Sequence, residues 1–345
     1  MEDCHMKYVV LESAGEASVK ESPLPALNRG DILVEMKACG LCGTDIEKMQ
    51  GRYLASQPVL GHEASGIVND VGEDVRAFKV GDRVFAHHHV PCYECYFCRH
   101  GSETMCPRYR ATNLDPGGFA EYFRVPAWNV ERGGVLKISN GVTFEEASLI
   151  EPTACCIRGL NRCSVSGNET VLIVGAGPIG LTHLRLLSMR GCKVLVSDIN
   201  LTRLESAERL GASIVYNAAK NDVPMKVKEK TAGIGADLAI VASGSHGAIV
   251  QALNAVRRGG KVCLFGVPPK GTRLDYDISD IFNSEVSIVT SNAATEVETK
   301  AALKLMEKRE LDLTSIITHR FKLEDFQTAV KTALQGDCGK IIITP

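Results

Sequence analysis

Long hydrophobic runs are absent from the sequence: its 345 residues contain no uninterrupted apolar stretch of about eighteen or more, the length from which a membrane-spanning helix is built. The first ten residues, MEDCHMKYVV, also lack the basic segment and the apolar segment of a secretory signal. We therefore expect no membrane partner and a cytoplasmic location.

A large excess of charge is absent as well. The formal net charge is −2 at pH 7, and the chain has no block of lysine and arginine. Surfaces that bind nucleic acid or anionic lipid need clustered positive charge. Because that cluster is missing, we expect no nucleic-acid partner and a small-molecule substrate instead. With 45% hydrophobic residues, the chain can build a sizeable core.

Cysteine, by contrast, is plentiful, with thirteen residues in a chain without an export signal. In a reducing compartment, thiols persist as metal ligands or buried small hydrophobic groups and seldom form disulfides. Four of them lie in PCYECYFCRHGSETMC: Cys92, Cys95, Cys98 and Cys106. A loop with this spacing can present four thiolates to a tetrahedral zinc ion, leaving no position open for water. We predict a structural zinc lobe at about 91–107; an iron–sulfur cluster and unliganded cysteines are the alternatives.

The stretch VLIVGAGPIG, residues 171–180, joins a buried strand to the dinucleotide signature G-x-G-x-x-G. The first glycine permits a tight turn, the second lets the backbone approach a pyrophosphate, and the third allows the helix that starts at 178 to pack closely on the strand. Free N–H groups at the start of that helix favour phosphate. The predicted cofactor-binding loop comprises Gly175, Gly177, Pro178, Ile179 and Gly180.

The next predicted strand, KVLVSD, ends at Asp198, twenty-three residues after Gly175. A carboxylate at this position hydrogen-bonds the two ribose hydroxyls and repels a 2′-phosphate, which favours NAD over NADP. Arg203 follows one helical turn later, near the same edge, and is included in the predicted cofactor site. The alternative is that Asp198 only caps the helix that begins at 201.

Strands and helices alternate through the second half of the chain, with about six predicted strands. This order predicts a doubly wound parallel sheet of the Rossmann type over residues 153–292. The first 150 residues instead contain short alternating segments broken by Gly, Pro, Asn and Asp, which predicts an antiparallel β domain. The C-terminal helix TKAALKLMEKRE and strand KIIITP have no Rossmann unit of their own, so we assign 1–152 and 293–345 to one catalytic domain. The predicted fold class is α/β.

Three short motifs offer further metal ligands: CGLCGTD at 39–45, GHE at 61–63 and EP at 151–152. Zinc accepts the thiolate of Cys42 and the imidazole of His62, and Glu63 and Glu151 supply carboxylates for a third protein position. One position would stay open to water or substrate. The alternative is a core histidine and a small buried cysteine without metal.

Taken together, the chain resembles the zinc-dependent medium-chain alcohol and polyol dehydrogenases along essentially its whole length. The motifs that carry this resemblance are CGLCGTD, VLGHEASG, the four-cysteine lobe, GGFAEY, NGVTFEEASLIEP, GAGPIGL and GKIIITP. The sorbitol and threonine dehydrogenase branches are the most similar, because they share Glu at the GHE and EP positions. The resemblance implies a GroES-like catalytic domain, a Rossmann domain, NAD, and one catalytic and one structural zinc per chain. It also implies a homotetramer or homodimer.

For the catalytic zinc, the resemblance implies Cys42, His62 and either Glu63 or Glu151 as ligands. It further implies that Asp45 orients His62.

Three more residues receive roles from the same resemblance. Thr44 would pass the hydroxyl proton outward, and Lys340 matches a basic position near the cofactor phosphates. Many relatives end the proton relay in a histidine where this chain has Glu47. Glu47 either accepts the proton or is a solvated helix residue.

These features predict transfer of a hydride from a secondary hydroxyl of a polyol, sugar or cyclitol to NAD. Sorbitol dehydrogenases place an Arg-Tyr pair against the polyol near the positions of Ala293 and Ala294, which points away from sorbitol itself. An L-threonine 3-dehydrogenase-like activity and a catalytically inactive nucleotide-binding relative are the alternatives.

Three consecutive histidines, His87, His88 and His89, follow the segment GDRVFA. Side chains alternate between the two faces of a strand, so we expect only His87 and His89 to converge, without a third ligand. One of the three histidines is predicted to line the substrate site.

Overall fold

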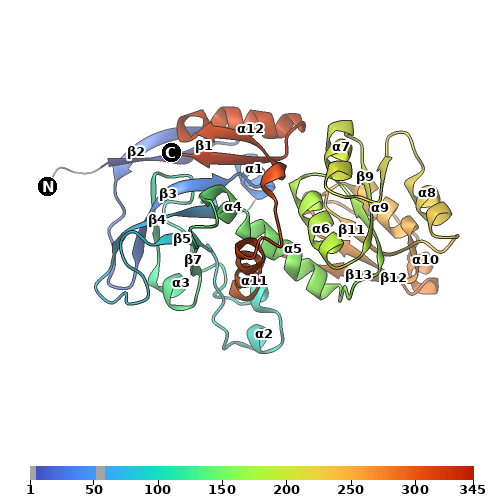
Figure 1. Cartoon of the computed structure of the whole chain (residues 1–345), viewed down its shortest axis with the longest axis horizontal. Coiled ribbons are helices and arrows are strands. Elements are labelled where there is room, and N and C mark those ends of the chain that lie inside the picture. The colour runs from blue at the N-terminus through green and yellow to red at the C-terminus, as the bar shows by residue number, and fades with distance from the viewer. Residues whose placement is uncertain (1–4, 52–58) are drawn as a thin grey trace. The chain divides into compact units, whose positions relative to one another are not determined.

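The computed structural model describes residues 5–51 and 59–345. The chain divides into two compact units (Figure 1). Unit 1 comprises Met1–Ala154 with Ala293–Pro345, and unit 2 comprises Cys155–Asn292. The division falls inside α5 (Ile150–Arg162). Each unit is described separately below.

Unit 2 is a six-stranded sheet in which every strand pairing is parallel. The strands are β8 (Thr170–Val174), β9 (Lys193–Asp198), β10 (Ile214–Asn217), β11 (Ala236–Val241), β12 (Val256–Leu264) and β13 (Ser287–Thr290). The helices are α6 (Pro178–Met189), α7 (Leu201–Arg209), α8 (Val223–Lys230), α9 (His246–Ala255) and α10 (Ile278–Asn283). The spatial order β10-β9-β8-β11-β12-β13 reverses direction between β8 and β11.

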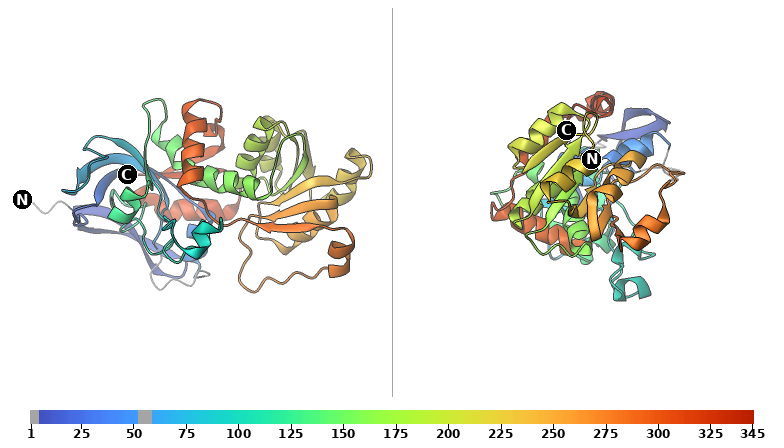
Figure 2. Two further views of the ribbon diagram at one scale, coloured as in Figure 1. Left: turned by 90° about the horizontal axis from the view of Figure 1, so that it is seen from below. Right: turned by 90° about the vertical axis from the view of Figure 1, so that its right-hand side faces the viewer.

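Helices cover both faces of this sheet. The neighbouring helices α6 and α7 lie on one face and the neighbouring helices α8 and α9 on the other (Figures 1 and 2). Strands enclosed in this way must be apolar on both sides, and Val171 to Ile173 of β8 are completely buried. The arrangement confirms the predicted doubly wound fold, in which ligands bind at the carboxyl ends of the strands where the order reverses.

Unit 1 contains a seven-stranded sheet and a separate hairpin. The sheet strands are β3 (Ile32–Gly40), β4 (Glu63–Val71), β5 (Arg83–Ala86), β6 (Tyr122–Val125), β7 (Val135–Lys137), β14 (Ile317–Lys322) and β15 (Lys340–Thr344). The hairpin strands are β1 (His5–Ser13) and β2 (Glu16–Pro23). The helices are α1 (Gly43–Met49), α2 (Tyr96–Arg99), α3 (Ala127–Glu131), α4 (Phe144–Ser148), α11 (Glu296–Glu307) and α12 (Phe326–Gln335).

Strand β3 organises this sheet, because it pairs with three others. Strand β4 lies along one edge of β3, while the other edge is shared by β6 at the N-terminal half and β15 at the C-terminal end. The last strand of the chain therefore belongs to the same sheet as β3, which lies about 300 residues earlier in the sequence. Because β15 pairs with the last two residues of β3, side chains from the C-terminal strand lie near the end of β3.

The sheet of unit 1 departs from the expected antiparallel pattern at one point. Strands β14 and β15 pair in parallel, whereas the other pairings within the sheet are antiparallel. The physical reason is α12, which connects the two strands: two parallel neighbours need such a crossover, and a short turn cannot supply it. The sequence pattern of the tail did not reveal this helix.

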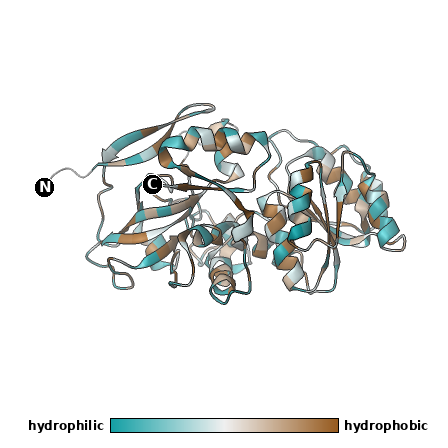
Figure 3. Cartoon of the chain, turned by 45° about the horizontal axis from the view of Figure 1, so that its top comes forward, coloured by the Kyte–Doolittle hydropathy of each residue, from teal (hydrophilic) through white to brown (hydrophobic). Residues whose placement is uncertain are grey.

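Each unit has its own hydrophobic interior. Hydrophobic residues gather in the strands, while polar residues occupy the outer sides of the helices (Figure 3). In unit 1 the core includes Met36, Phe119, Phe123 and Phe326. The ring of Phe119, three residues before β6, contacts the ring of Phe326, the first residue of α12. Within residues 5–51 and 59–345, none of the helices combines the length and apolar character needed to span a bilayer.

Candidate metal centres and nucleotide-binding loop

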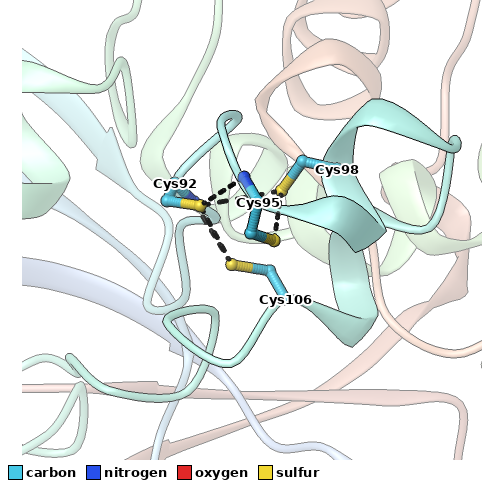
Figure 4. A group of neighbouring side chains, drawn as sticks. All are labelled: Cys92, Cys95, Cys98 and Cys106. Atoms are coloured by element: carbon cyan, nitrogen blue, oxygen red, sulfur yellow. Dashed lines mark hydrogen bonds between the residues drawn. The ribbon is translucent and has the colours of Figure 1, made fainter.

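The four lobe cysteines converge on one point in unit 1 (Figure 4). Their sulfurs lie 3.5 Å apart for Cys95–Cys98 and for Cys92–Cys106, and 4.0 Å apart for Cys92–Cys98. A tetrahedron with Zn–S bonds of about 2.3 Å has sulfurs separated by about 3.8 Å. The observed spacing brackets that value, and all four thiols are unbridged, so the lobe fits a tetrahedral metal site.

Backbone amides prepare these sulfurs for a cation. The amides of Glu94 and Cys95 donate to Cys92 Sγ at 3.4 and 3.3 Å, and the amide of Arg108 donates to Cys106 Sγ at 3.3 Å. Hydrogen bonds to its sulfur, first from the amide of Glu94 and then from the amide of Cys95 and the thiols of Cys106 and Cys95, outweigh burial and lower the pKa of Cys92 to about 6. Because the thiolate is the metal-binding form, these amide contacts favour metal binding.

The second cluster forms where β3, α1 and β4 meet. In the antiparallel register, Gly40 of β3 lies opposite Glu63 of β4. Cys42 caps the N-terminus of α1 two residues after Gly40, and His62 immediately precedes Glu63. Ligand atoms of Cys42, His62 and Glu63 consequently lie within 4.8 Å of one another. Gly40 makes room for this arrangement, because a Cβ there would come within 1.9 Å of Glu63 Oε2.

Asp45 holds the imidazole of this cluster from behind. It is fully buried, and its Oδ1 atom lies 3.3 Å from His62 Nδ1 and accepts a hydrogen bond from the amide of Gly61 at 3.1 Å. Burial opposes a charge on His62, but the charges of Asp45 and Cys42 outweigh it and raise the pKa of His62 well above its usual value. The pocket therefore attracts positive charge, which a divalent ion can supply in place of the proton.

Lys340 lies in the same pocket. Its ammonium forms an ion pair with Glu63 Oε2, and both side chains are almost completely buried. Burial opposes the charge on Lys340, but Glu63 and Cys42 outweigh it and raise its pKa. The expected role of Lys340 at the cofactor phosphates stays a prediction; within unit 1 its ammonium is the buried counter-ion of Glu63, brought there by the pairing of β15 with β3.

The two candidate carboxylates separate into different groups. Glu63 lies with Cys42 and His62, whereas Glu151, on α5, lies with His87 and His88, whose ligand atoms are also within 4.8 Å of one another. The sequence left open which carboxylate accompanies Cys42 and His62, and the geometry groups Glu63 with them.

The histidine run differs from the expectation. Strand β5 ends at Ala86, and the carbonyls of His87 and His88 accept hydrogen bonds from the side chain of buried Asn129 at 2.9 and 3.1 Å. The alternation of side chains along a strand therefore does not apply to these residues. The prediction that at most His87 and His89 converge, without a third ligand, is wrong, because the ligand atoms of His87, His88 and Glu151 lie within 4.8 Å of one another.

The donor set beside β3 and β4 fits zinc. It combines a thiol, an imidazole and a carboxylate, which are the three ligand types that zinc takes in catalytic sites. Glu63 Oε1 is buried and accepts no hydrogen bond from the described residues, a costly state that a cation would relieve. Thr44 and Glu47 lie on α1, two and five residues after Cys42, and both are partly exposed.

The glycine loop of unit 2 has the conformation its sequence predicts. Gly175 follows β8 with φ of +105°, and Gly177 caps α6, with Pro178 at its first position and Ile179 next. A Cβ at Gly180 would lie 1.9 Å from the carbonyl oxygen of Gly175, so only glycine allows this helix to approach the turn so closely. A Cβ at Gly177 would meet nothing closer than 3.9 Å, which leaves its surface open for a phosphate.

Asp198 ends β9 beside this loop. Its Oδ2 accepts the amide of Ala176 at 2.6 Å, and its Oδ1 accepts the amide of Asn200 at 2.9 Å. Helix α7 is capped by Asn200, so the alternative that Asp198 is its cap is wrong. The guanidinium of Arg203 lies 4.0 Å from Asp198 Oδ2.

Local sequence revealed neither the grouping of His87 and His88 with Glu151, nor the contact of His87 with Glu296, nor the partner of Lys340. Glu296 lies 209 residues from His87, and its carboxylate is 3.0 Å from His87 Nδ1. The only local signal was the unusual run of three histidines.

Comparison with known families assigns both halves of the chain. Residues 28–134 match the alcohol dehydrogenase GroES-like domain, and residues 178–308 match the zinc-binding dehydrogenase domain. The two matches lie on either side of α5.

Individual relatives span nearly the whole chain. A sorbitol dehydrogenase of Bacillus subtilis (strain 168) is 30% identical over 99% of this chain and 98% of the relative. An L-threonine 3-dehydrogenase of Pseudoalteromonas translucida (strain TAC 125) is 32% identical over 94% of each. A crystal structure from Sinorhizobium meliloti 1021, described as a zinc-binding dehydrogenase bound to NADP, superimposes with a TM-score of 0.91 at 29% identity, covering 99% of this chain and all of the other.

The lobe cysteines should matter for stability and Cys42 should not. We expect Cys95→Ser to remove one zinc per chain and to lower the melting temperature by roughly 5 °C or more, because a lost metal ligand is among the strongly destabilising changes. Cys42→Ser, the matched control, should leave the melting temperature within about 1 °C. Metal analysis and thermal unfolding measure both effects. Equal melting temperatures for the two variants would refute the prediction that the lobe cysteines, and not Cys42, stabilise the fold.

Gly180→Ala should impair nucleotide binding. The added methyl group displaces α6 from the Gly175 turn, so we expect the dissociation constant for NADH to rise about tenfold or more, a loss of roughly 1.4 kcal/mol. The matched control is Gly247→Ala on α9, where a Cβ meets nothing closer than 3.8 Å. Fluorescence titration with NADH compares them, and an unchanged constant for Gly180→Ala would contradict the packing argument.

Proposed function

The chain belongs to the zinc-dependent medium-chain alcohol and polyol dehydrogenases, and from this premise we propose that it oxidises a secondary hydroxyl of a polyol, sugar or cyclitol with NAD. The observation that carries the proposal is the cluster of Cys42, His62 and Glu63 in unit 1 of a chain whose unit 2 holds a complete dinucleotide loop. A closed four-thiolate site alone would support only a structural role.

Cys42, His62 and Glu63 would hold a zinc ion as three protein ligands, so that a fourth coordination position would remain for the substrate oxygen. When bound there, zinc supplies a Lewis acid that lowers the pKa of a hydroxyl, and the nicotinamide supplies the hydride acceptor. Asp45 fixes the orientation of His62 through its 3.3 Å contact. Lys340 balances the charge of Glu63, so the pocket does not collect excess negative charge when a hydroxyl loses its proton.

The proton released from the hydroxyl needs a path to solvent. Thr44, the second residue of α1, carries a hydroxyl that both accepts and donates hydrogen bonds. Glu47 lies one helical turn further and is partly exposed, so its carboxylate is suited to receive the proton from Thr44 and release it to water. We propose this pair as the relay in place of the histidine that many relatives carry.

The substrate class follows from the relatives and from one difference. Sorbitol and L-threonine dehydrogenases align with nearly the whole chain. Ala294, near the position of the polyol-contacting pair in sorbitol dehydrogenases, is fully buried, and its carbonyl accepts a hydrogen bond from Tyr109. A methyl group sealed in this way offers no contact to a polyol chain, which supports a substrate other than sorbitol.

We propose NAD as the preferred cofactor because of Asp198. Two backbone amides orient its carboxylate, and the fixed negative charge disfavours a 2′-phosphate. The S. meliloti relative was solved with NADP, and Arg203, 4.0 Å from Asp198, is the group that would contact a 2′-phosphate if the carboxylate were absent. The expected homotetramer or homodimer and the cytoplasmic location likewise stay proposals.

Turnover of a hydroxyl panel tests the function. We expect NADH to form with at least one of myo-inositol, glucose, other sugars and polyols, and Cys42→Ser to reduce kcat/KM roughly a hundredfold or more, because loss of a ligand exceeds the effect of its supporting residues. Absorbance at the NADH band measures the rate. L-Threonine as the best substrate would favour the amino-alcohol alternative, and no turnover by fully zinc-loaded protein would favour an inactive relative.

The cofactor preference has its own test. We expect Asp198→Ser to raise the ratio of kcat/KM for NADP to that for NAD by about tenfold or more, corresponding to about 1.4 kcal/mol, because the repelling carboxylate is removed. Adding Arg203→Ala to this variant should lower the ratio again, since the guanidinium then no longer pairs with the 2′-phosphate. Taking the ratio cancels any general damage to the loop. A wild-type enzyme that already prefers NADP would contradict the proposal.

A further inference from the structure

A third group of metal-type ligands lies in unit 1, and the proposed reaction does not use it. His87, His88 and Glu151 place their ligand atoms within 4.8 Å of one another. This group shares no residue with the cluster of Cys42, His62 and Glu63, which has its own carboxylate. Two donor sets that share no residue therefore lie next to each other in unit 1, where the rings of His62 and His88 are 4.9 Å apart, in addition to the four-cysteine lobe.

Two nitrogen atoms of this group are buried without a partner. His87 Nε2 and His88 Nδ1 form no hydrogen bond with any described residue, while the two side chains are 0% and 8% exposed. Buried polar atoms are normally satisfied by protein, water or an ion. Imidazole nitrogen is a preferred ligand for borderline divalent ions, so an ion between these two rings and the carboxylate of Glu151 would satisfy both atoms.

The other ring nitrogen of His87, Nδ1, contacts a carboxylate, an arrangement that is common for histidines that bind metals. Glu296 Oε1 lies 3.0 Å from His87 Nδ1, and Glu296 Oε2 accepts the phenolic hydrogen of Tyr93. A carboxylate can only accept, so Nδ1 carries the ring proton and Nε2, which has no hydrogen-bond partner among the described residues, keeps its lone pair for a metal ion. Metal-binding histidines characteristically donate their second N–H to a carboxylate in this way.

We propose that His87 Nε2, His88 Nδ1 and the carboxylate of Glu151 bind a divalent transition-metal ion, separate from the ion at Cys42, His62 and Glu63. Two imidazoles with one carboxylate suit Zn²⁺, Co²⁺ or Ni²⁺, whereas Mg²⁺ and Ca²⁺ prefer oxygen ligands throughout. The full chain then binds three such ions. In the competing arrangement, a single ion binds Glu151 together with Cys42 and His62. The imidazoles of His87 and His88 then bind no metal.

Titration of metal-depleted full-length protein with Co²⁺ distinguishes the two arrangements. We expect three equivalents per chain by mass spectrometry of bound metal. Two of them should give sulfur-to-cobalt charge-transfer absorption, because the lobe and the Cys42 cluster contain thiolates. The third should add only the weaker visible bands of a nitrogen and oxygen site. Saturation at two equivalents would overturn the proposal.

Substitutions identify the residues that bind the third equivalent of Co²⁺. The double substitution His87→Gln with His88→Gln should lower the count to two without changing the charge-transfer bands. The matched control is His89→Gln, since His89 bonds its Nδ1 to the carbonyl of Thr112 at 3.0 Å and is not in the group. Retention of three equivalents by the double variant, or loss of a charge-transfer band, would overturn the assignment.

A milder variant covers the case in which the double substitution does not fold. Glu296→Gln removes no ligand but weakens the partner of His87 Nδ1, so we expect the affinity for the third Co²⁺ alone to fall about tenfold to a hundredfold. Glu307→Gln, an exposed carboxylate on the same helix α11, is the control and should change none of the three affinities. Equal affinities for Glu296→Gln and wild type would contradict the proposed site.

Discussion

The pairing register of β3 with its two neighbours is the constraint on which the rest of unit 1 depends. Gly40 lies opposite Glu63 on one side and opposite Ile342 on the other. These two pairings set the positions of His62, Glu63 and Lys340 around the start of α1, where Cys42 stands. A slip of one residue would turn each side chain to the opposite face of the sheet and disperse the cluster.

The register also concentrates charge where water is absent. Asp45, Glu63, Glu151 and Lys340 are all at least nine-tenths buried in unit 1. Buried charges are tolerated only when they are paired or bind a metal. The ion pair of Lys340 with Glu63 and the contact of Asp45 with His62 meet part of this demand. Three buried atoms that form no hydrogen bond with the described residues, Glu63 Oε1, His87 Nε2 and His88 Nδ1, make this part of the molecule suited to divalent ions.

The four-cysteine lobe is linked to the same region through α11. Tyr109 packs against Cys98 and Cys106 and donates to the carbonyl of Ala294, while Tyr93 donates to Glu296 at the start of the helix. Glu296 in turn contacts His87. Tyr93 and Glu296 therefore connect the four-cysteine lobe to the buried imidazole of His87.

The sequence by itself determined whatever depends on short-range spacing. The four cysteines, the glycine turn and the alternation of strands with helices each lie within a few tens of residues, and from them the doubly wound sheet, the family and the ligand types followed. Only the tertiary structure decided which carboxylate joins Cys42 and His62, that Lys340 neutralises Glu63, and that His87 meets Glu296. These contacts join residues up to 277 positions apart, as 340 − 63 shows for Lys340 and Glu63. No local pattern encodes them, because strand register and helix packing across the whole unit set which distant side chains meet.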